Sequence, residues 1–519
     1  MTGATPPDRS VRLADLLADA LGVGADDLTE VRVTGIAQEA ARVRPGHVFV
    51  ARVGRRRDGH DFVPDAIARG AACVVGTRDA MPGIGVPYVH VDDDRLATSA
   101  LAAAFHGHPS RDLIVCGVTG TDGKTTTANL LHHLLQGAET RPRASLLSTA
   151  MERIGAEGRP PEQHFTTPEA TEVHAHLAAA RAAGARWAVI EASSHAASLQ
   201  RLAHVDFGLM LWTNLSPEHL DHHGTVEAYR EAKASLVRQA AGAVLNRDDP
   251  NFAAFDGAAS GRVTSYALAG PADVRAENVV AEADGLSFDL VTGDGRRRAH
   301  LPMLGRFNVA NALAALAAAV RLGVPMDTAV ERLASFGGVP GRMELVASEP
   351  FTVVVDFAHT PEGLAKALAT LRPAAGGRLL VVQGAPGERD PRNRAGLGAA
   401  AVAGADLAIF TEDDARSEDL DQILAAMVAG AVAAGGVDGQ DYRVQPDRRS
   451  AIALALAMAR PGDVVLLAGK GHERTLERGS GAVPWDEAAE ARAALAALAA
   501  RARGGEPAPA EGPAGGAGA

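Results

Sequence analysis

The sequence predicts an α/β protein of three domains: a small N-terminal α/β domain, a central P-loop-type ATPase with a mostly parallel sheet, and a C-terminal Rossmann-like domain. Apolar runs alternate with helical stretches along most of the chain, as in doubly wound folds. A chain of 519 residues is also too long for a single hydrophobic core. Its content of 47% hydrophobic and 22% charged residues is typical of a soluble globular protein.

Residues 1–110 are expected to form the first domain. The runs HVFVA, ACVVG and PYVHV predict strands, and one helical stretch is expected near residues 61–69. The basic cluster Arg52–Arg57 is interpreted as a solvated loop, with contact to an anionic ligand as the alternative.

Residues 111–344 are expected to form the central domain. LIVCGV predicts a strand that enters a glycine-rich loop, and the loop is followed by an amphipathic helix with its leucines, Leu130, Leu131, Leu134 and Leu135, on one side. RWAVIEA, DFGLMLWTN and GAVLN predict further strands. Because helical stretches separate these runs, the sheet is expected to be largely parallel.

Residues 345–503 repeat this alternation. FTVVVD, RLLVVQG, DLAIFT and DVVLLAG predict strands with alanine-rich helices between them, and therefore a second doubly wound sheet. The segment 504–519 is rich in Pro, Gly and Ala, so it is expected to be a disordered tail.

Composition and charge narrow the function class. The net charge of −12 argues against general affinity for nucleic acid or anionic membranes. No apolar run is long enough to span a bilayer, and no signal peptide is recognised. Cys73 and Cys116 lie in apolar runs and are expected to be buried thiols, as in a reducing compartment. We therefore expect a cytoplasmic protein.

The stretch GVTGTDGKTTTANLL, Gly117–Leu131, predicts a nucleotide site. It departs from a Walker A motif because Val118 stands where the leading glycine belongs. Glycines after a strand let backbone N–H groups face a phosphate, and the next helix adds its positive end. Lys124 is suited to the β and γ phosphates and Thr125 to Mg²⁺. A tight turn is the alternative, but the strand–loop–helix context favours ATP, bound by Gly120, Thr121, Gly123, Lys124, Thr125 and Thr126.

Nine stretches in fixed order carry a family resemblance. They are GVTGTDGKTTT, FTTPEAT, EASSHA, TNLSPEHLDHHGTVEAYREAKASL, FNVANALAA, GVPGRMELV, DFAHTPEGL, TEDDARSED and LAGKGHE. In this order the chain resembles the Mur ligase family, specifically its UDP-N-acetylmuramoyl-tripeptide synthetases, and the resemblance extends from about residue 30 to 475. The resemblance implies an ATP-dependent ligase with three domains, one for each substrate.

Four residues are candidate metal ligands: Thr125, Glu191, His219 and Lys233. Glu191 ends a predicted strand, where a carboxylate can hold Mg²⁺. The histidines of HLDHHG leave zinc as an alternative, and Lys233 by itself reads as a surface lysine. The resemblance implies instead that Glu191 and His219 hold Mg²⁺ and that Lys233 is carbamylated to N6-carboxylysine, which requires a lowered pKa.

The resemblance also implies the substrate contacts. The expected ATP contacts beyond the loop are Asn308, Arg342, Asp356 and His359. The expected contacts to the UDP-sugar-peptide are Thr166, Thr167, Ser193 and Arg201. The expected amino-acid pocket contains Arg389, Asp413, Asp414, Arg416, Gly469 and Glu473.

Three departures from the family pattern bear on substrates. Glu39, Ala40 and Ala41 stand where Asp-Ser-Arg usually helps seat the uridine nucleotide, and Leu199 replaces a glutamine. Asp413-Asp414-Ala415-Arg416 replaces the Asp-Asn-Pro-Arg of members that add meso-diaminopimelate. Arg416 is suited to the second carboxylate of diaminopimelate, whereas the charge of Asp414 suits lysine or ornithine.

The expected reaction is ATP-dependent amide formation through an acyl phosphate. We expect a monomer that adds a diamino acid, first of all meso-diaminopimelate, to UDP-N-acetylmuramoyl-L-Ala-D-Glu in peptidoglycan synthesis, and so serves cell shape and division. The alternatives are lysine or ornithine as acceptor, a divergent ligase joining another carboxylate and amine, and a nucleotide-dependent scaffold without chemistry.

Overall fold

The computed structural model describes residues 9–504 apart from 25–27, 29, 55, 56, 140, 162–164 and 283. These residues form two compact units, each described by itself. Unit 1 holds the described residues up to Glu277 together with Asp289–Arg297 and Ala310–Leu333. Unit 2 holds Asn278–Phe288, Arg298–Val309 and the described residues from Ala334 onward. Arg55, Arg56 and the expected tail from residue 505 lie outside the described residues.

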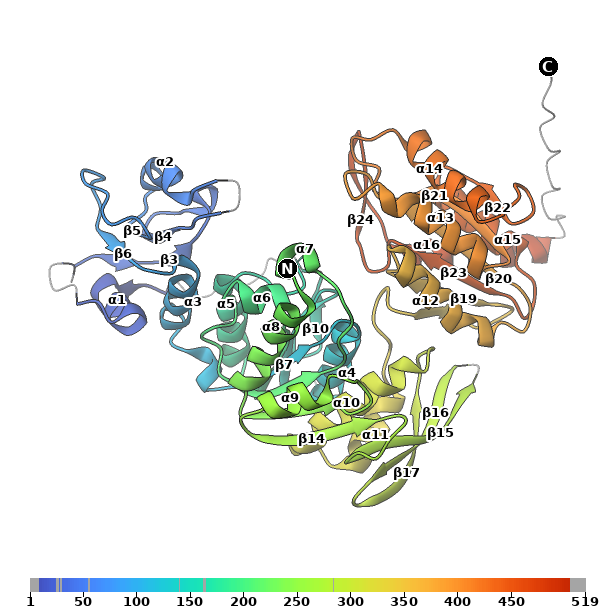
Figure 1. The fold of residues 1–519 in the computed structure, drawn as a ribbon, viewed down its shortest axis with the longest axis horizontal. Coiled ribbons are helices and arrows are strands. Elements are labelled where there is room, and N and C mark those ends of the chain that lie inside the picture. Colours follow the sequence, from blue (N-terminus) through green and yellow to red (C-terminus); the bar gives the residue numbers. More distant parts are fainter. Residues whose placement is uncertain are drawn as a thin grey trace. The chain divides into compact units, whose positions relative to one another are not determined.

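Unit 1 begins with a four-stranded parallel sheet in the order β3 (Gly35–Ala37), β4 (His47–Ala51), β5 (Cys73–Gly76), β6 (Tyr88–His90). One buried cluster joins this sheet to α1 (Leu13–Leu21) and α3 (Asp94–Phe105), and another joins its other face to α2 (Val63–Ala68) (Figure 1). The three predicted strands are confirmed as β4–β6. The single expected helix is α2; α1 and α3 are additional. Residues Val11–Arg12 and Arg32–Val33, β1 and β2, pair beside the sheet.

The second sheet has eleven strands in the order β10-β9-β8-β11-β7-β12-β13-β14-β15-β16-β17. Its strands are β7 (Ile114–Thr119), β8 (Ala144–Leu147), β9 (Glu152–Ile154), β10 (Glu157–Arg159), β11 (Trp187–Glu191), β12 (Phe207–Trp212), β13 (Gly242–Asn246), β14 (Arg262–Ala267), β15 (Val274–Glu282), β16 (Gly285–Thr292) and β17 (Gly295–Leu301). From β8 to β15 every neighbouring pair is parallel, as the sequence predicts.

Helices cover both faces of this sheet. One buried cluster joins one face to α5 (Ala170–Ala182), α6 (Ser194–Ser198), α8 (Val226–Gln239) and α9 (Phe252–Ala258). The predicted leucine-rich helix is α4 (Lys124–Gln136). It is buried nearly all round, because it also contacts α10 (Phe307–Arg321) through Asn311 and α11 (Met326–Ala334) through Arg332. The short α7 (Leu220–His223) precedes α8.

Unit 2 contains a six-stranded sheet in the order β18-β19-β23-β20-β21-β22. Its strands are β18 (Glu344–Ala347), β19 (Thr352–Asp356), β20 (Leu379–Ala385), β21 (Leu407–Glu412), β22 (Tyr442–Val444) and β23 (Val464–Ala468). All pairs are parallel except β18 with β19. The four predicted strands are confirmed as β19, β20, β21 and β23.

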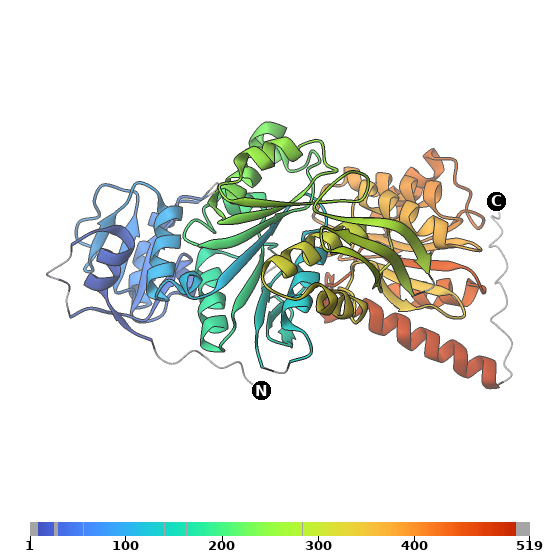
Figure 2. The same cartoon turned by 90° about the horizontal axis from the view of Figure 1, so that it is seen from below.

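Two buried clusters show that this sheet is doubly wound. Val354 lies in one cluster with residues of α12 (Pro361–Leu371), α13 (Arg392–Gly404) and α14 (Leu420–Ala433). Its neighbours Val353 and Val355 lie in the other cluster, with residues of α15 (Arg448–Met458) and α16 (Glu487–Gly504). This alternation is the period of two expected of a strand buried on both faces. Figure 2 shows helices on both sides of this sheet, with α16 as the long red helix. A hairpin of β24 (Thr475–Arg478) and β25 (Gly481–Pro484) lies between β23 and α16 in the chain.

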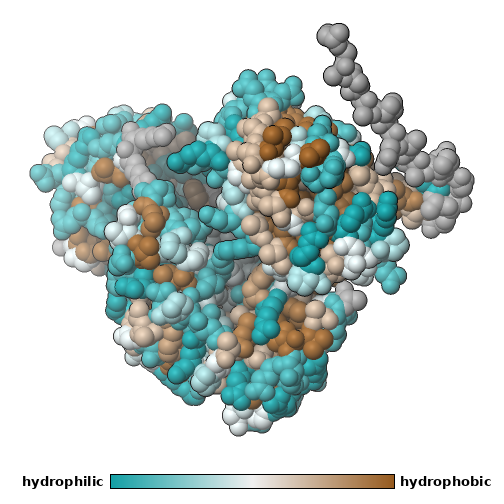
Figure 3. Space-filling view, turned by 45° about the vertical axis from the view of Figure 1, so that its right-hand side comes forward, coloured by the Kyte–Doolittle hydropathy of each residue, from teal (hydrophilic) through white to brown (hydrophobic). Residues whose placement is uncertain are grey.

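On the face that Figure 3 shows, hydrophilic areas surround separate hydrophobic patches. Among the described helices, none has the length and apolar character needed to cross a membrane. Cys73 and Cys116 are buried free thiols, as expected.

Candidate active site

The predicted phosphate loop joins a strand to a helix, as the sequence indicates. β7 ends at Thr119 and α4 begins at Lys124, with Gly123 at its N-cap in a left-handed conformation (φ 82°). A Cβ on Gly123 would collide with Asn311 Oδ1, and one on Gly120 with Thr213 Oγ1. Both positions therefore require glycine, which keeps the backbone N–H groups and the N-terminus of α4 open to an anion.

Two lysines reach the carbonyl oxygen of Gly120. Lys124 Nζ donates to it at 3.0 Å and also to Thr121 O at 2.7 Å. Lys233 Nζ, from α8, donates to it at 2.6 Å and is 1% exposed. Burial lowers the pKa of Lys233 well below its usual value of 10.5, and the charge of Lys124 lowers it further. Lys233 is therefore a buried lysine and not a surface lysine.

A buried carboxylate lies beside the first turn of α4. Glu191, at the end of β11, is fully buried and accepts a hydrogen bond from Thr125 Oγ1 at 3.1 Å. It also accepts hydrogen bonds from the backbone N–H of Thr149 at 2.8 Å and from the Thr149 hydroxyl at 3.2 Å. This group offers only oxygen ligands, the kind that Mg²⁺ prefers. Thr149 was not expected at the site.

His219 lies among aromatic side chains. It precedes α7 with φ 55°, and its ring lies 4.8 Å from that of His195 and 6.1 Å from that of Tyr229. His222 and His223 also pack on His195, but their Nε2 atoms face the hydroxyls of Ser198 and Ser194. Burial lowers the pKa of His195 to about 4, and the neighbouring histidines add to this effect.

The residues expected to contact the UDP-sugar-peptide lie next to Glu191. Thr167 Oγ1 donates to Glu191 O at 2.7 Å and to Ser193 Oγ at 3.1 Å, and Thr166 beside it is half-buried. Arg201 donates to Thr167 O at 2.8 Å. Glu169 forms ion pairs with Arg201, at 2.6 Å, and with Arg52, at 2.8 Å, which directly follows β4. Arg52 of the basic cluster is therefore paired inside unit 1.

Three of the four other residues expected to contact ATP lie around Phe357 in unit 2. Arg342 stacks on its ring at 4.8 Å, and His359 Nδ1 lies 2.9 Å from its carbonyl oxygen. Asp356 accepts a hydrogen bond from Met343 N at 2.8 Å. Burial raises the pKa of Asp356, although the charge of Arg342 acts to lower it. Asn308 is buried at the start of α10 and donates to Leu304 O.

The expected amino-acid pocket contains a lysine that the sequence analysis did not single out. Lys470 is fully buried, and its Nζ lies 2.7 Å from Asp414 Oδ1, 2.6 Å from Glu473 Oε2 and 3.6 Å from Asp413 Oδ1. Burial opposes its charge, but the three carboxylates outweigh burial and raise the pKa of Lys470. A Cβ on Gly469 would lie 2.8 Å from Asp413 Oδ2.

Arg416 is engaged within the protein. Its Nε lies 2.8 Å from Glu477 Oε2, and its Nη1 donates to Gly387 O at 2.6 Å. The backbone N–H of Glu477 also donates to Asp414 at 2.8 Å. Glu477 is therefore a second residue that the sequence analysis missed. Arg389 is exposed at the edge of this region.

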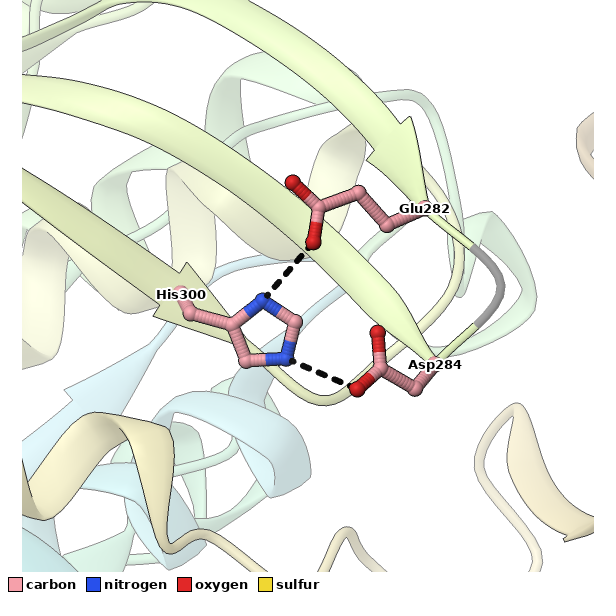
Figure 4. A group of neighbouring side chains, drawn as sticks. All are labelled: Glu282, Asp284 and His300. Carbon is pink, nitrogen blue, oxygen red and sulfur yellow. Dashed lines mark ion pairs between the residues drawn. The ribbon is translucent and has the colours of Figure 1, made fainter.

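Two groups of histidine and carboxylate side chains among the described residues are close enough to be considered for a metal. In the first, Asp413, Asp414 and Glu473 surround the ammonium of Lys470, which already supplies the cation. The second is exposed: Glu282 faces Nδ1 of His300 at 3.6 Å and Asp284 faces Nε2 at 3.8 Å (Figure 4). The two carboxylates lie at opposite ring nitrogens, and each contact is an ion pair only when His300 is protonated.

Family models match three successive stretches of the chain. The model for the Mur ligase family, catalytic domain, matches residues 32–106, the Mur ligase middle domain matches 118–319, and the Mur ligase, glutamate ligase domain, matches 341–471.

Individual relatives match over nearly the whole chain. The UDP-N-acetylmuramyl-tripeptide synthetase of Deinococcus radiodurans is 50% identical, over 94% of this chain and 100% of the relative. The UDP-N-acetylmuramoyl-L-alanyl-D-glutamate–2,6-diaminopimelate ligase of Gloeobacter violaceus is 38% identical, over 94% and 98%. A solved structure of a ligase with the latter name superimposes with a TM-score of 0.67 at 30% identity, over 93% of this chain and 99% of that one. The chain therefore belongs to the Mur ligase family.

Proposed function

We propose that this protein is an ATP-dependent ligase that joins a diamino acid to the D-glutamate carboxylate of UDP-N-acetylmuramoyl-L-Ala-D-Glu in peptidoglycan precursor synthesis. The observation that carries the proposal is the phosphate loop with Lys124 and Lys233 on one carbonyl and the buried Glu191 at its helix. The substrate carboxylate attacks the γ-phosphate of ATP to give an acyl phosphate and ADP. The amine then attacks the acyl carbon, and inorganic phosphate leaves.

Mg²⁺ is the proposed cofactor. Thr125, Glu191 and His219, together with carboxylated Lys233, are the residues that would hold it, and the ion would neutralise charge on the phosphates. The depressed pKa of Lys233 supports the carbamate, because only the neutral amine reacts with CO₂. A ¹³C-carbamate signal from ¹³C-bicarbonate is expected in the protein and absent in Lys233→Met. Activity lost in Lys233→Ala should not return with bicarbonate, although short carboxylates should restore part of it.

We further propose three functional domains, with boundaries at 1–110, 111–344 and 345–503. The first would seat the UDP-sugar, where Glu39, Ala40 and Ala41 weaken ordinary uridine contacts. The second would hold ATP and the peptide end at Thr166, Thr167, Ser193 and Arg201. The third would bind the amino acid and supply Arg342, Asp356 and His359 to the nucleotide. We propose a cytoplasmic monomer.

Two charge pairs bear on which amino acid is the acceptor. The names of the relatives favour meso-diaminopimelate, whose second carboxylate suits Arg416. Lysine or ornithine is the second candidate, and the Arg416–Glu477 pair at 2.8 Å favours it, because Glu477 takes the position on Arg416 that a substrate carboxylate would need. Asp414 does not decide the question, since Lys470 neutralises it.

Release of inorganic phosphate tests the function directly. With ATP, Mg²⁺ and UDP-muramoyl-dipeptide, release should require a diamino acid, and Lys124→Ala should lower the rate by about 10²-fold or more. If the dipeptide does not stimulate phosphate release, the proposed function is replaced by that of a divergent ligase that joins another carboxylate and amine. Nucleotide binding without turnover for any acceptor would point to a scaffold.

A further inference from the structure

A cavity lies within unit 1. It measures about 740 Å³ and is lined by residues of β14, β15 and β16 and of helices α10 and α11. This volume falls in the range of small-molecule sites. Part of the lining is apolar, with Val274, Val291, Val320 and Met326, and three arginines give the cavity a net positive charge: Arg262, Arg275 and Arg321 against Asp273 and Asp294.

Two of these arginines, Arg262 and Arg321, lie near enough for their charges to interact. Arg321 hydrogen-bonds only to Thr264 Oγ1, at 3.3 Å, and neither Arg262 nor Arg321 forms an ion pair within 4.0 Å among the described residues. Burial lowers the pKa of Arg321, and the charge of Arg262 lowers it further. Arg275 differs, because it pairs with Glu277 at 3.1 Å.

The acids of the lining compensate this charge only in part. Hydrogen bonds from Ser265 are the main reason why the pKa of Asp273 is lowered, and the charge of Arg262 adds to this effect. Asp273 accepts hydrogen bonds from the backbone N–H and the hydroxyl of Ser265, both at 2.7 Å. Asp294 is exposed in the turn after β16. Two like charges that lack an ion pair within 4.0 Å in the described part of the chain cost free energy that a bound anion would recover.

The cavity lies at the end of the sheet opposite to the phosphate loop. Arg262 pairs in register with Gly242, the first residue of β13, whereas the loop follows Thr119, which pairs with Trp212 at the last residue of β12. Helix α10 also runs from the loop to the cavity. Asn311 lies beside Gly123 of the loop, and Arg321 lies ten residues further, about 15 Å along the helix. The cavity is therefore separate from the candidate active site.

We propose that this cavity binds a phosphorylated small molecule with an apolar body, as a site distinct from the ATP site. Arg262 and Arg321 bind the phosphate, with the hydroxyl of Thr264 beside them, and Val320 and Met326 contact the apolar part. The backbone of Gly242 allows Arg321 to lie flat across the strand end, because a Cβ there would collide with its guanidinium.

Calorimetric titration of the purified protein with phenyl phosphate in 150 mM NaCl tests this site. Phenyl phosphate should bind at one site, more tightly than inorganic phosphate. Arg262→Gln and Arg321→Gln should each weaken binding at least tenfold. Lys124→Ala should leave it unchanged, which separates this cavity from the phosphate loop.

Arg238→Gln is the matched control, since Arg238 is an exposed arginine of α8 in unit 1 and lies outside the cavity lining. Thermal unfolding checks that each variant folds. If Arg321→Gln does not fold, Arg262→Gln still tests the proposal, because Arg262 is exposed. Absence of binding in 150 mM NaCl, or equal affinity in the wild type and Arg262→Gln, would overturn the proposal. Loss of binding in Lys124→Ala alone would assign the phosphate to the loop and also overturn it.

Discussion

Lys124 and Lys233 donate to the same carbonyl oxygen, that of Gly120, at 3.0 and 2.6 Å. Lys124 comes from the helix after the loop and Lys233 from α8, about a hundred residues later. Of the two ammonium groups, Lys233 is the fully buried one, so its charged form is the less favourable. This pairing sets the partly buried Lys124 beside an amine whose pKa lies well below its ordinary value.

The pH dependence of folding stability is expected to report the depressed pKa of Lys233. Between that pKa and 10.5 the unfolded chain binds more protons at this residue than the folded protein, so stability rises with pH across this window. Lys233→Met lacks this titration. Its stability relative to the wild type should therefore be highest near pH 7 and fall toward pH 10, as measured by urea unfolding in metal-free, CO₂-free buffer. A difference that stays constant with pH would contradict a lowered pKa.

Glu191→Gln should separate charge from packing. An amide oxygen at the position of Oε2 still accepts from the hydroxyls of Thr125 and Thr149, so the fold should persist. The backbone N–H of Thr149 loses its acceptor, and the negative charge for a cation is gone. The Mg²⁺ concentration that gives half-maximal phosphate release should rise about tenfold or more. Glu157→Gln, on the exposed β10, is the control. An unchanged Mg²⁺ curve would remove Glu191 from the metal site.

Strands with continuous apolar runs could be predicted from the sequence, because burial on both faces leaves a clear signal. Helix α3 in the first domain shows where this signal is weak: its sequence, DRLATSALAAAF, contains five alanines and only three large apolar side chains. The later strands β14–β17 also escaped prediction, since polar residues interrupt them.

Site residues within motifs could be predicted, but their partners could not. Thr149 contacts Glu191 across 42 residues and Lys470 contacts Asp414 across 56, and no local pattern encodes such contacts. One signal was available for Lys470. The chain has only four lysines, Lys124, Lys233, Lys366 and Lys470, and uses arginine elsewhere. An arginine fork would not fit where a compact ammonium meets three carboxylates.

Gly123→Ala should damage the phosphate loop through crowding more than through backbone strain. Its φ of 82° disfavours any side chain, and the added Cβ would meet Asn311 Oδ1. Gly184→Ala, with φ 81° and open space around it, measures the strain alone. We expect Gly184→Ala to cost about 1 kcal/mol of stability and Gly123→Ala about 1–3 kcal/mol more, with ATP binding lost only in the latter. Equal losses in urea unfolding would mean that Asn311 moves freely away.

Glu477→Ala should shift the choice of acceptor. Removing the carboxylate that occupies Arg416 leaves the guanidinium open to a substrate carboxylate. A charge-assisted hydrogen bond contributes about 1.5–3 kcal/mol, so kcat/KM for meso-diaminopimelate relative to lysine should rise about tenfold or more. Glu362→Ala, an exposed position on α12, is the control. If the ratio of the two kcat/KM values stays as in the wild type, Arg416 does not bind the side chain of the acceptor amino acid.

Lys470→Met should destabilise unit 2 in a pH-dependent way. Without the ammonium, the buried Asp413 and Asp414 and the partly buried Glu473 lose the cation that they share, and among the described cations Asp414 keeps only Arg416, at 3.8 Å. This loss costs about 3–5 kcal/mol near pH 8. Their pKa values in the folded variant then rise above those in the unfolded chain, so the variant regains stability as the pH falls toward 5 and these groups take up protons. Urea unfolding at several pH values measures this, with the exposed Lys366→Met as control. A deficit that is as large at pH 5 as at pH 8 would mean that lost packing, and not charge, accounts for it.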